Sequence, residues 1–455
     1  MARIAMFVLN DVSSDARVLR EAGSLASAGH EVVIMGRPAD PLSRLPETEA
    51  RPGFTIRRVP IPGRVRRMLL RHSAGRTIAR SLGPGPAASV PSLGTGGATH
   101  AAAPPERMEA GTIARAVPVP FVGDLMDGGE WLLRWRLGVA AWCRAAAAAA
   151  PPADVWHAHD LDTLEAAWRA RAAHGGRLVY DCHEVFLESG SHARRPPWAR
   201  RVLARRERRW GRDADLVITV NESLADDLQE RLGRRPVIVR NTPPAWTPPE
   251  PPPDLLRERL GLAAGTPLVL YHGGFLPDRG LPELIAALGE PGLERAHLVL
   301  LGSGPLEPLL AELAAAPAAG GRVHLLAPVP PDALLAWVAS ADVAAMPNQP
   351  RTRNERLSTP NKLFEALAAG VPVVSSDFPE RRHILLDDPE GPLGRVCDPT
   401  DRAALAAALR ELLDLPPAER AALRARILRA AHARYTWEAE SARLLEAYRP
   451  LLEDR

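Results

Sequence analysis

One stretch of the sequence decides the fold, and it runs Ser358-Thr359-Pro360-Asn361-Lys362-Leu363-Phe364-Glu365-Ala366-Leu367-Ala368-Ala369-Gly370-Val371-Pro372-Val373-Val374. Ser358 or Thr359 can cap a helix that Pro360 opens, and Gly370 can end that helix in the left-handed conformation. Val371 to Val374 then has the apolar composition of a buried strand. The stretch therefore predicts a helix followed by a strand, the repeating unit of an α/β sheet.

Lys362 is the single lysine of a chain whose other strongly basic residues are all arginine. It stands three residues before Glu365, so both lie on one face near the positive end of the helix. A cation, a carboxylate and a helix N-terminus can together hold a nucleoside diphosphate, with the phosphates at Lys362 and the ribose hydroxyls at Glu365. The alternative is an ordinary intrahelical ion pair worth about 0.2–0.5 kcal/mol. The pair alone does not decide between them.

The length and composition indicate a globular protein of two domains. A chain of 455 residues exceeds what one hydrophobic core organises, so two domains of about 200 residues each are expected. The net charge is only +3, but several arginine clusters favour anionic partners, which can be phosphates, lipid headgroups or nucleic acid. Cys143, Cys182 and Cys397 lack paired spacing, so neither a disulfide framework nor a cysteine zinc site is expected.

The apolar runs are too short for targeting or membrane insertion. The segment from Ala2 to Asn10 is shorter than a signal peptide and suits a buried first strand. No run of about 18 apolar residues occurs, and the alanine tract after Arg144 ends at Pro151. We therefore expect a cytoplasmic protein, in a reducing compartment, that does not span a membrane.

The first half of the chain alternates strands with helices, which implies a parallel sheet with right-handed crossovers. Residues 1–240 are therefore predicted to form a doubly wound, Rossmann-like domain. Residues 60–118 are rich in Gly, Pro, Ala and Ser and predict a partly disordered insertion. The expected strands are Ile4–Leu9, His30–Gly36, Phe54–Val59, Asp154–His157, Leu178–Asp181, Leu216–Val220 and Val237–Val239. The expected helices are Ala16–Ala28, Glu130–Ala150, Leu161–Ala173, Pro197–Arg212 and Ser223–Arg231.

A proline-dense connector at residues 241–254 separates this domain from a second one at 255–434. Residues 435–455 form a last amphipathic helix, expected at Trp437–Leu452, that crosses back over the first domain. We predict an α/β protein of two doubly wound domains facing a central cleft, where ligands bind beyond the carboxyl ends of the strands. The expected strands are Leu268–Tyr271, Leu298–Leu301, Val323–Leu326, Val343–Met346, Val371–Val374 and Arg395–Cys397, and later helices are Asp401–Leu413 and Pro417–Arg434.

Two glycine-rich loops follow strands of the second domain. One is His272-Gly273-Gly274 and the other is Gly302-Ser303-Gly304-Pro305, and both let backbone amides approach a ligand closely. Arg279, in the loop after Gly274, can reach a diphosphate. A single loop of this kind is usually a plain turn, and Arg279 alone can be a solvated loop arginine. Two loops and the stretch 358–370 on one domain edge favour a phosphate site.

These second-domain motifs resemble the donor half of the retaining glycosyltransferases of family 4, the glycogen-synthase-like enzymes with the GT-B fold. The motifs are Tyr271-His272-Gly273-Gly274, Arg279-Gly280, Leu301-Gly302-Ser303-Gly304-Pro305 and the stretch from Pro360 to Val374. Motifs of the first domain are similar to the acceptor half, and they are Asp15–Ala22, Gly29–Val32, Trp156–Asp160, Tyr180–Glu184 and Ile218–Ser223. The resemblance covers nearly the whole chain except the insertion.

The chain departs from the family pattern at three positions. Many members carry two glutamates with seven residues between them; Glu365 matches the second, whereas Leu357 occupies the first position, with Glu355 nearby. Many members have an arginine directly after the glycine where this chain has Gly274. The usual lysine–glycine pair appears here as Arg279-Gly280. The chain resembles the subgroup with a Pro-Asn-Lys helix start, in which the first glutamate is not universal.

The resemblance implies retaining transfer of a sugar from a nucleoside diphosphate to a hydroxyl of a saccharide, a lipid-linked glycan or a small molecule. Lys362 and Arg279 would stabilise the departing diphosphate, and His159 would contact the transferred sugar. The acceptor attacks from the front face and the leaving phosphate takes its proton, so no catalytic nucleophile is assigned. The implied donor-binding residues are Gly273, Gly274, Gly302, Ser303, Gly304, Ser358, Thr359, Pro360, Asn361, Leu363 and Glu365, and the acceptor-side residues are Asp11, Asp15, Asp160, His183 and Glu184.

Structural explanations stay open on the acceptor side. His159 can be a hydrogen-bonded structural histidine, and Asp11 and Asp15 can equally well cap loops. We expect strand alternation to place His157 on the opposite face from His159. On that placement no metal site is expected, and the resemblance implies no metal or other cofactor.

The arginines from Arg194 to Arg212 interleave with Trp198, Val202, Leu203 and Trp210, which predicts a basic amphipathic helix. With a second patch at Arg64–Arg80, it can lay the acceptor domain on an anionic membrane, although a solvated arginine face is the alternative. The basic clusters lack a nucleic-acid-reading module. Two alternatives to the transferase remain, a non-catalytic nucleotide-sugar or polysaccharide-binding protein and a nucleotide-sugar 2-epimerase, which needs carboxylate acid and base groups that the sequence does not offer.

Overall fold

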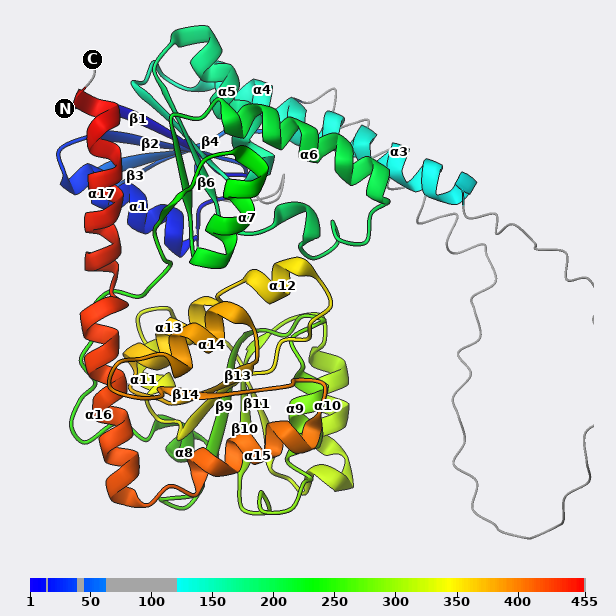
Figure 1. The fold of residues 1–455 in the computed structure, drawn as a ribbon, viewed down its shortest axis with the longest axis vertical. Coiled ribbons are helices and arrows are strands. Elements are labelled where there is room, and N and C mark those ends of the chain that lie inside the picture. Colours follow the sequence, from blue (N-terminus) through cyan, green and yellow to red (C-terminus); the bar gives the residue numbers. More distant parts are fainter. Residues whose placement is uncertain (14, 39–44, 63–120, 454–455) are drawn as a thin grey trace, which may run out of the picture.

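The structure is a computed structural model that describes residues 1–13, 15–38, 45–62 and 121–453. It contains two parallel sheets, each covered by helices on both faces (Figure 1). This arrangement confirms the predicted fold class of two doubly wound domains. The predicted insertion at 60–118 lies almost wholly outside the described residues, as does the basic patch at Arg64–Arg80.

The first sheet has eight strands in the order β3-β4-β2-β1-β5-β6-β7-β8. Its strands are β1 (Arg3–Phe7), β2 (Glu31–Gly36), β3 (Thr48–Arg51), β4 (Phe54–Arg58), β5 (Val155–His159), β6 (Arg177–Cys182), β7 (Leu216–Thr219) and β8 (Val237–Ile238). Only β3 runs antiparallel, paired with β4 across a turn in which Arg51 faces Phe54. The sequence prediction missed β3 because it is a polar edge strand with three of its four residues exposed.

Helices of the first domain cover both faces of this sheet. Apolar residues of α1 and α17 form one core with the strands, and those of α4, α5 and α7 form the other. The helix predicted at 130–150 is wrong in detail, because Gly138 separates α3 from α4. The helices are α1 (Ala16–Ser27), α3 (Phe121–Leu137), α4 (Val139–Ala149), α5 (Leu161–His174), α6 (Pro197–Arg212) and α7 (Glu222–Leu232), with a short η1 (Phe186–Glu188).

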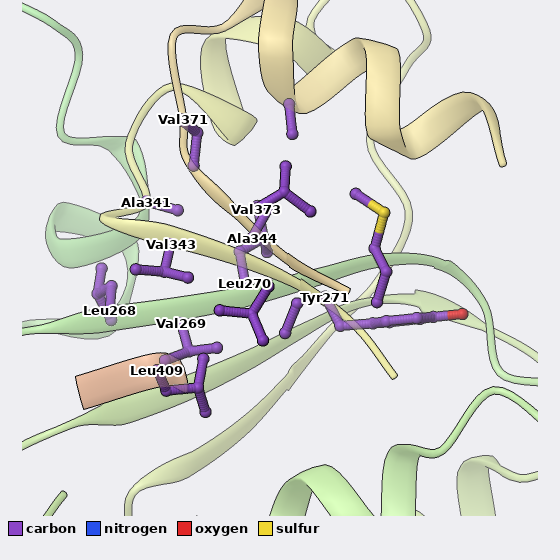
Figure 2. Packing of buried hydrophobic residues seen from close by; sticks show 14 of the residues in the cluster. Leu268, Val269, Leu270, Tyr271, Ala341, Val343, Ala344, Val371, Val373 and Leu409 are labelled. Carbon is purple, nitrogen blue, oxygen red and sulfur yellow. The ribbon is translucent and has the colours of Figure 1, made fainter. Parts of the chain in front are cut away.

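The second sheet has six strands in the order β11-β10-β9-β12-β13-β14. Strand β9 is central, and its apolar run packs with β12 and β13 in the core that Figure 2 shows around Leu270 and Val373. Continuous apolar runs of this kind are expected where helices cover both faces of a parallel sheet. The strands are β9 (Leu268–Gly274), β10 (His297–Ser303), β11 (Val323–Leu326), β12 (Val343–Met346), β13 (Val373–Ser376) and β14 (Gly394–Cys397).

The helices of the second domain begin after the proline-dense connector. They are α8 (Leu255–Leu260), α9 (Leu281–Ala287), α10 (Glu307–Ala315), α11 (Leu334–Val338), α12 (Arg353–Leu357), α13 (Asn361–Ala368), α14 (Pro379–Leu386), α15 (Arg402–Leu413) and α16 (Pro417–Arg434), with a short η2 (Pro317–Ala319). Helix α17 (Trp437–Glu453) follows α16 and returns to the first domain (Figure 1). There Trp437 Nε1 donates to Ser24 Oγ and Tyr448 packs in the first core, so the predicted crossing helix is confirmed.

Segments that follow the carboxyl ends of strands in the two sheets contact one another. Asn354 accepts from the backbone N–H of Val185 and donates to Glu184, and Asn221 donates to the carbonyl of Leu357. Arg353 pairs with the buried Asp227. Helix α12 therefore docks on the first domain, and the strand ends of the two sheets face each other, as Figure 1 shows.

Candidate active site

The predicted glycine loops lie side by side at the ends of β9 and β10. Gly302 pairs with Gly273 and Ser303 pairs with Gly274 in the parallel register. A Cβ atom on Gly302 would lie 1.9 Å from the carbonyl oxygen of Gly273, so a side chain there is impossible. The glycines bring two strand ends into backbone contact, and they leave Gly273, Gly274 and Ser303 exposed at the edge of the sheet.

Lys362 reaches this edge from the first turn of α13. Its ammonium nitrogen lies 3.8 Å from the centre of the Tyr271 ring, and a Cβ on Gly273 would lie 3.1 Å from it. The ammonium makes no ion pair or hydrogen bond with any residue that the structure describes. Burial and the neighbouring Arg279 hold the pKa of Lys362 well below its usual range. Lys362 is therefore a cation held in place without a counter-ion.

Glu365 binds His272 rather than Lys362. The carboxylate lies 2.8 Å from His272 Nε2, at the end of β9. Burial opposes ionisation, but the hydrogen bond from His272 and the charges of His272 and Lys362 lower the pKa of Glu365. The intrahelical ion pair that was the simple alternative is absent from the described contacts. Glu365 remains partly exposed, with 21% of its side chain accessible.

Arg279 is paired with Glu355 in the structure. Its guanidinium lies 3.2 Å from Glu355 Oε2, and the same carboxylate accepts from Asn348 Nδ2 at 3.0 Å. Leu357, where many family members carry a glutamate, packs instead on Val185 and Leu224 of the first domain. The carboxylate closest to Leu357 in the sequence is Glu355, two residues earlier, and its partner is Arg279.

Arg381 is a third cation of the site, and the sequence reasoning missed it. Its side chain is fully buried, with its guanidinium hydrogen-bonded to Asn348 Oδ1 at 3.2 Å and to the carbonyl of Ser358 at 3.4 Å. Burial lowers the pKa of Arg381 to about 10. The signal in the sequence is its place in the first turn of the helix after β13, at the same edge as the glycine loops.

The start of α13 differs from the prediction. The helix begins at Asn361 with Pro360 at the cap position, so the expected Ser358 or Thr359 cap is wrong. Thr359 Oγ1 accepts from Asn221 Nδ2 of the first domain at 2.9 Å, while Ser358 Oγ donates to the carbonyl of Glu355. Gly370 has the expected positive φ of 72°. Both hydroxyls thus serve local or interdomain bonds rather than the helix.

Other residues of the predicted donor set occupy different environments. Asn361 is exposed in the first turn, and Gly304 follows Ser303 with its Cα against the backbone of Phe275. Leu363 is fully buried in the core of the second domain. Its side chain therefore cannot reach a ligand, and only its backbone, in the first turn of α13, lies near the edge formed by the ends of β9 and β10.

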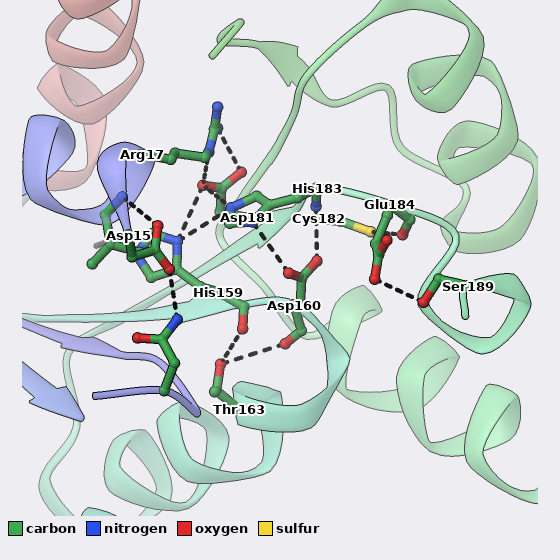
Figure 3. Close-up of polar contacts among 12 residues, drawn as sticks. Asp15, Arg17, His159, Asp160, Thr163, Asp181, Cys182, His183, Glu184 and Ser189 are labelled. Carbon is green, nitrogen blue, oxygen red and sulfur yellow. Dashed lines mark hydrogen bonds and ion pairs between the residues drawn. The ribbon is translucent and has the colours of Figure 1, made fainter. Parts of the chain in front are cut away.

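His159 ends β5 within a buried polar cluster of the first domain (Figure 3). Its Nδ1 lies 3.3 Å from Asp181 Oδ2 and 3.3 Å from His183 Nε2, and its Nε2 has no partner among the described residues. Burial lowers the pKa of His159. His159 is therefore a neutral ring whose Nδ1 is held by its neighbours and whose Nε2 is unused.

Asp181 and Arg17 form the centre of this cluster. The Arg17 guanidinium donates two hydrogen bonds to Asp181, at 2.8 and 2.9 Å, and lies 2.9 Å from Glu21. Burial opposes ionisation, but Arg17 and His183 hold the pKa of Asp181 well below its usual range. Burial raises the pKa of Glu21. The charges of the cluster are therefore matched within it.

The predicted separation of His157 from His159 is wrong. Their rings stack with centroids 4.3 Å apart, because side chains alternate with a period of two and residues two apart share one face. One donor atom each from Glu21, His157, His159 and Asp181 lies within 4.8 Å of the others, which is a set that can hold a metal ion. The Arg17 guanidinium already binds both carboxylates, and such charge matching competes with a metal ion. The absence of a metal requirement stays a prediction.

The remaining acceptor-side residues form hydrogen bonds within loops, at the start of α1 and across the contact between the domains. Asp11 accepts from the hydroxyl and N–H of Ser13, and Asp15 caps α1 through the N–H of Val18. Asp160 binds the side chain and backbone of His183, and the carboxylates of Asp160 and Asp181 raise the pKa of His183 against the effect of burial. Glu184 accepts from Ser189 at 2.8 Å and from Asn354 of the second domain at 3.2 Å.

The basic helix α6 turns its apolar residues inward. Ala199 and Leu203 are buried in a cluster with Trp131 and Trp135 of α3, and Trp210 packs against the first-domain core. The outward face is mostly arginine. The apolar side of this helix is therefore not available to enter a bilayer. None of the described helices is long and apolar enough to cross a membrane.

Solved structures with this arrangement include glycosyltransferases that have the GT-B fold. Sucrose-phosphate synthase from Thermosynechococcus elongatus superposes with a TM-score of 0.71 at 19% identity, over 100% of both chains. HepE from Anabaena, solved with UDP and glucose, superposes with a TM-score of 0.61 at 16% identity, over 99% of this chain and 100% of that one. At these identities the likeness defines the fold, which is GT-B.

The family follows from the sequence matches. Residues 266–415 match the family described as Glycosyl transferases group 1, and residues 96–242 match Glycosyltransferase Family 4. The D-inositol 3-phosphate glycosyltransferase of Xylanimonas cellulosilytica is 31% identical over 311 residues, which are 65% of this chain and 71% of that protein. The chain belongs to the family 4 glycosyltransferases. Membership favours transfer over the binding protein and the 2-epimerase considered from the sequence.

Proposed function

We propose that the protein is a retaining glycosyltransferase that uses a nucleoside-diphosphate sugar. One observation carries the proposal: Lys362, without a counter-ion, stands at the glycine edge of β9 and β10 beside Arg279 and Arg381. Three cations face only two carboxylates, Glu355 and Glu365, in this part of the site. A site with surplus positive charge and exposed backbone suits a diphosphate.

The donor would lie with its diphosphate between the glycine loops and α13. Lys362 and the first N–H groups of α13 face the phosphates, and the loop backbones approach them closely because Gly273 and Gly302 carry no side chain. Glu365, ionised and oriented by His272, would accept the two ribose hydroxyls. Arg279 would reach the phosphates from its ion pair with Glu355.

Leaving-group stabilisation supplies the rate enhancement. As the bond between the anomeric carbon and the phosphate oxygen breaks, negative charge grows on the diphosphate. Cations and N–H groups already in place stabilise that charge without reorganisation, and one well-placed donor contributes about 3–4 kcal/mol. Lys362 is the group best placed for this role, because no internal partner competes for it.

The carboxylates of the donor site support front-face transfer. Glu365 is engaged by His272, and Glu355 by Arg279 and Asn348, so neither is free to attack the anomeric carbon. In the proposed step the acceptor oxygen bonds to the anomeric carbon as the phosphate leaves, and the acceptor proton passes to the departing phosphate oxygen. Retention follows because attack and departure take place on one face of the sugar.

His159 would contact the transferred sugar through Nε2, which is buried in the free protein and has no partner among the described residues. The acceptor would bind between the domains near His159 and the loops that hold Asp11 and Asp15. Its class is a hydroxyl of a saccharide, a lipid-linked glycan or a small molecule. Because HepE was solved with UDP and the Xylanimonas relative is named for an inositol phosphate, UDP-sugars and phosphorylated polyols are the first substrates to examine.

A donor panel tests the proposal. The protein is incubated with UDP-, GDP- and ADP-sugars, and slow hydrolysis of one donor is expected. Lys362→Ala and Glu365→Ala should each reduce it, Lys362→Ala by a factor on the order of 10²–10³. Arg382→Ala is the matched control, an exposed cation of the same domain paired with Asp377. Tight donor binding without turnover on any donor and acceptor would contradict the proposal.

We also propose that the protein works at the cytoplasmic side of a membrane, held by charge alone. The outward arginines of α6 would supply the attraction, at about 1 kcal/mol for each residue near an anionic surface. Sedimentation with anionic and neutral vesicles measures it. Binding to anionic vesicles that disappears at high salt is expected, and the absence of salt-sensitive binding would rule it out.

A further inference from the structure

A cavity of about 400 Å³ lies in the helix layer of the first domain, outside the candidate active site. Every residue that lines it belongs to α3, α4, α5 or α6, and Figure 1 shows α4, α5 and α6 side by side on one side of this domain. Five arginines line the cavity against one glutamate, Glu165. The charge of its wall is therefore strongly positive.

Four of these arginines have no ion pair or hydrogen bond among the described residues. Arg169 binds Glu165 Oε1 at 2.8 Å, and this pair neutralises the single carboxylate. The others make no ion pair or hydrogen bond with any residue in the described ranges, and they are Arg136, Arg144, Arg206 and Arg209. Like charges held around one cavity repel each other, so a bound anion would relieve that repulsion.

Two tryptophans give the cavity a fixed wall. The rings of Trp168 and Trp210 lie with centroids 6.1 Å apart, and Trp168 Nε1 donates to Asp213 at 3.0 Å. The Arg209 guanidinium lies 5.7 Å from the centre of the Trp168 ring. Stacking on an indole orders an arginine at little cost in side-chain freedom, and such an arginine presents its donors in a fixed plane.

A second cavity, between the first domain and α12 of the second, pairs most of its arginines with carboxylates. It lies between η1, α6, α7 and α12 and is also lined by arginines. There Arg231 pairs with Glu207 and Asp227, Arg353 with Asp227, and Arg200 with Glu188. Of the arginines that line this cavity, Arg201 alone has no ion pair or hydrogen bond among the described residues, so a high arginine content does not by itself leave most cavity arginines unpaired. The tryptophan-walled cavity is different because a single carboxylate, Glu165, faces its five arginines.

We propose that the tryptophan-walled cavity binds a multiply charged phosphate-type anion, at a site separate from sugar transfer. Planar guanidinium groups match phosphate oxygens in pairs, and four of those that line this cavity have no ion pair or hydrogen bond among the described residues. The anion can come from a free phosphate compound or from a lipid headgroup, and both would use the same arginines. The proposal does not depend on the donor site, since no residue of the second domain lines the cavity.

Calorimetry with inorganic pyrophosphate tests the proposal on the full chain, in the Lys362→Ala background so that the candidate donor site is weakened. Arg206→Gln with Arg209→Gln should weaken the remaining binding at least tenfold. The matched control is Arg205→Gln with Arg208→Gln, which removes the same charge from the same helix at positions that are exposed, as Arg206 and Arg209 are, but that do not line the cavity. Thermal unfolding without ligand checks that both double variants fold.

Equal weakening in the two double variants would show general charge attraction and overturn the proposal, as would the absence of any pyrophosphate binding beyond the donor site. Vesicles with and without anionic lipid distinguish the sources. Vesicle binding lost in the Arg206/Arg209 pair alone assigns the anion to a headgroup, whereas pyrophosphate binding without vesicle binding assigns it to a free compound. Donor hydrolysis, measured separately, reports on the proposed transferase and is expected to be the same in both pairs.

Discussion

Arg17 of the first domain is buried and Lys362 of the second is half-buried at the sheet edge, and the two cations have opposite surroundings. Arg17 donates to Asp181 and the carbonyl of Val239 and lies against Glu21, so its charge is matched inside the protein. Lys362 lies over the Tyr271 ring beside two further cations and has no partner among the described residues. The first arrangement stabilises a fold, whereas the second costs stability and suits a ligand that brings the missing charge.

Removing Arg17 should break the matched cluster, with the largest effect on stability. Arg17→Met leaves Asp181 buried without its main counter-ion, and breaking a buried pair in this way costs about 3–5 kcal/mol. Denaturant unfolding followed by the fluorescence of the first-domain tryptophans measures the loss. Arg205→Met, at an exposed position of α6, is the control and should change stability by less than about 0.5 kcal/mol. A small effect of Arg17→Met would mean that the cluster is not held by charge.

Glu184 links the two domains. It lies three residues after Asp181 in the sequence, and its carboxylate accepts a hydrogen bond from Asn354 of the second domain. Burial and the nearby Asp160 raise the pKa of Glu184 to about 7. A carboxyl whose pKa is raised in the folded state keeps its proton there while the unfolded chain has lost it. Stability is therefore lost as the pH rises from about 4.5 to about 7, by an amount on the order of 3 kcal/mol.

Glu184→Gln should remove this pH dependence. The variant is expected to be more stable than the parent at pH 8 and to differ little from it at pH 4.5, because the parent carboxyl is then neutral. Thermal unfolding across this range measures the difference. Glu230→Gln, an exposed position on α7, should reproduce the parent profile. A parent profile that rises between pH 5 and 7 in step with ionisation of Glu184 would contradict the assignment.

The fold was predictable because most strands are apolar runs and several helices, such as α5, α7 and α8, end at a glycine. What the sequence hid was local or weakly apolar: β3 is a polar edge strand, and Gly138 divides a helix within an otherwise continuous pattern. The Pro52-Gly53 pair before β4 was the available signal for the β3–β4 turn. The separation of His157 from His159 failed for a different reason, since a period of two places them together.

The sequence was enough to predict which sheet edge carries the site, but not which side chains of the site pair with one another. Strand ends of a parallel sheet share one edge, so the glycine loops and Lys362 could be brought together from the sequence. Pairing between distant residues could not, because it depends on side-chain distances: Glu355 binds Arg279, His272 orients Glu365, and Thr359 serves the other domain. Arg381 lies beyond the motif that carried the prediction, and its burial against Asn348 appears only in three dimensions.

A bound diphosphate should act as the counter-ion of Lys362, and its binding should be accompanied by proton uptake. Burial and Arg279 lower the pKa of Lys362 in the free protein, whereas a bound anion favours the charged ammonium and raises that pKa. Between the two values, binding takes up as much as one proton and affinity falls by up to tenfold for each pH unit of increase. Calorimetry of UDP or pyrophosphate binding in buffers of different ionisation enthalpy counts the protons. Lys362→Arg keeps a charge that does not titrate, so uptake should vanish in that variant.

The smallest predicted effect is that of replacing Lys362 on stability. It distinguishes the two cations most directly, because replacing Lys362 should stabilise the protein whereas replacing Arg17 should destabilise it. An ammonium whose pKa is lowered in the folded state destabilises the fold at any pH below its unfolded value. Lys362→Met removes that charge at similar volume and should therefore stabilise the second domain, by about 0.5–1 kcal/mol at pH 7. The gain should shrink as the pH rises from the folded-state pKa of Lys362 towards its ordinary value, since the parent lysine then becomes neutral. Unfolding measured at pH 7 and pH 10 without anions tests both statements, and a loss of stability on replacing Lys362 would place it with Arg17 as a structural cation.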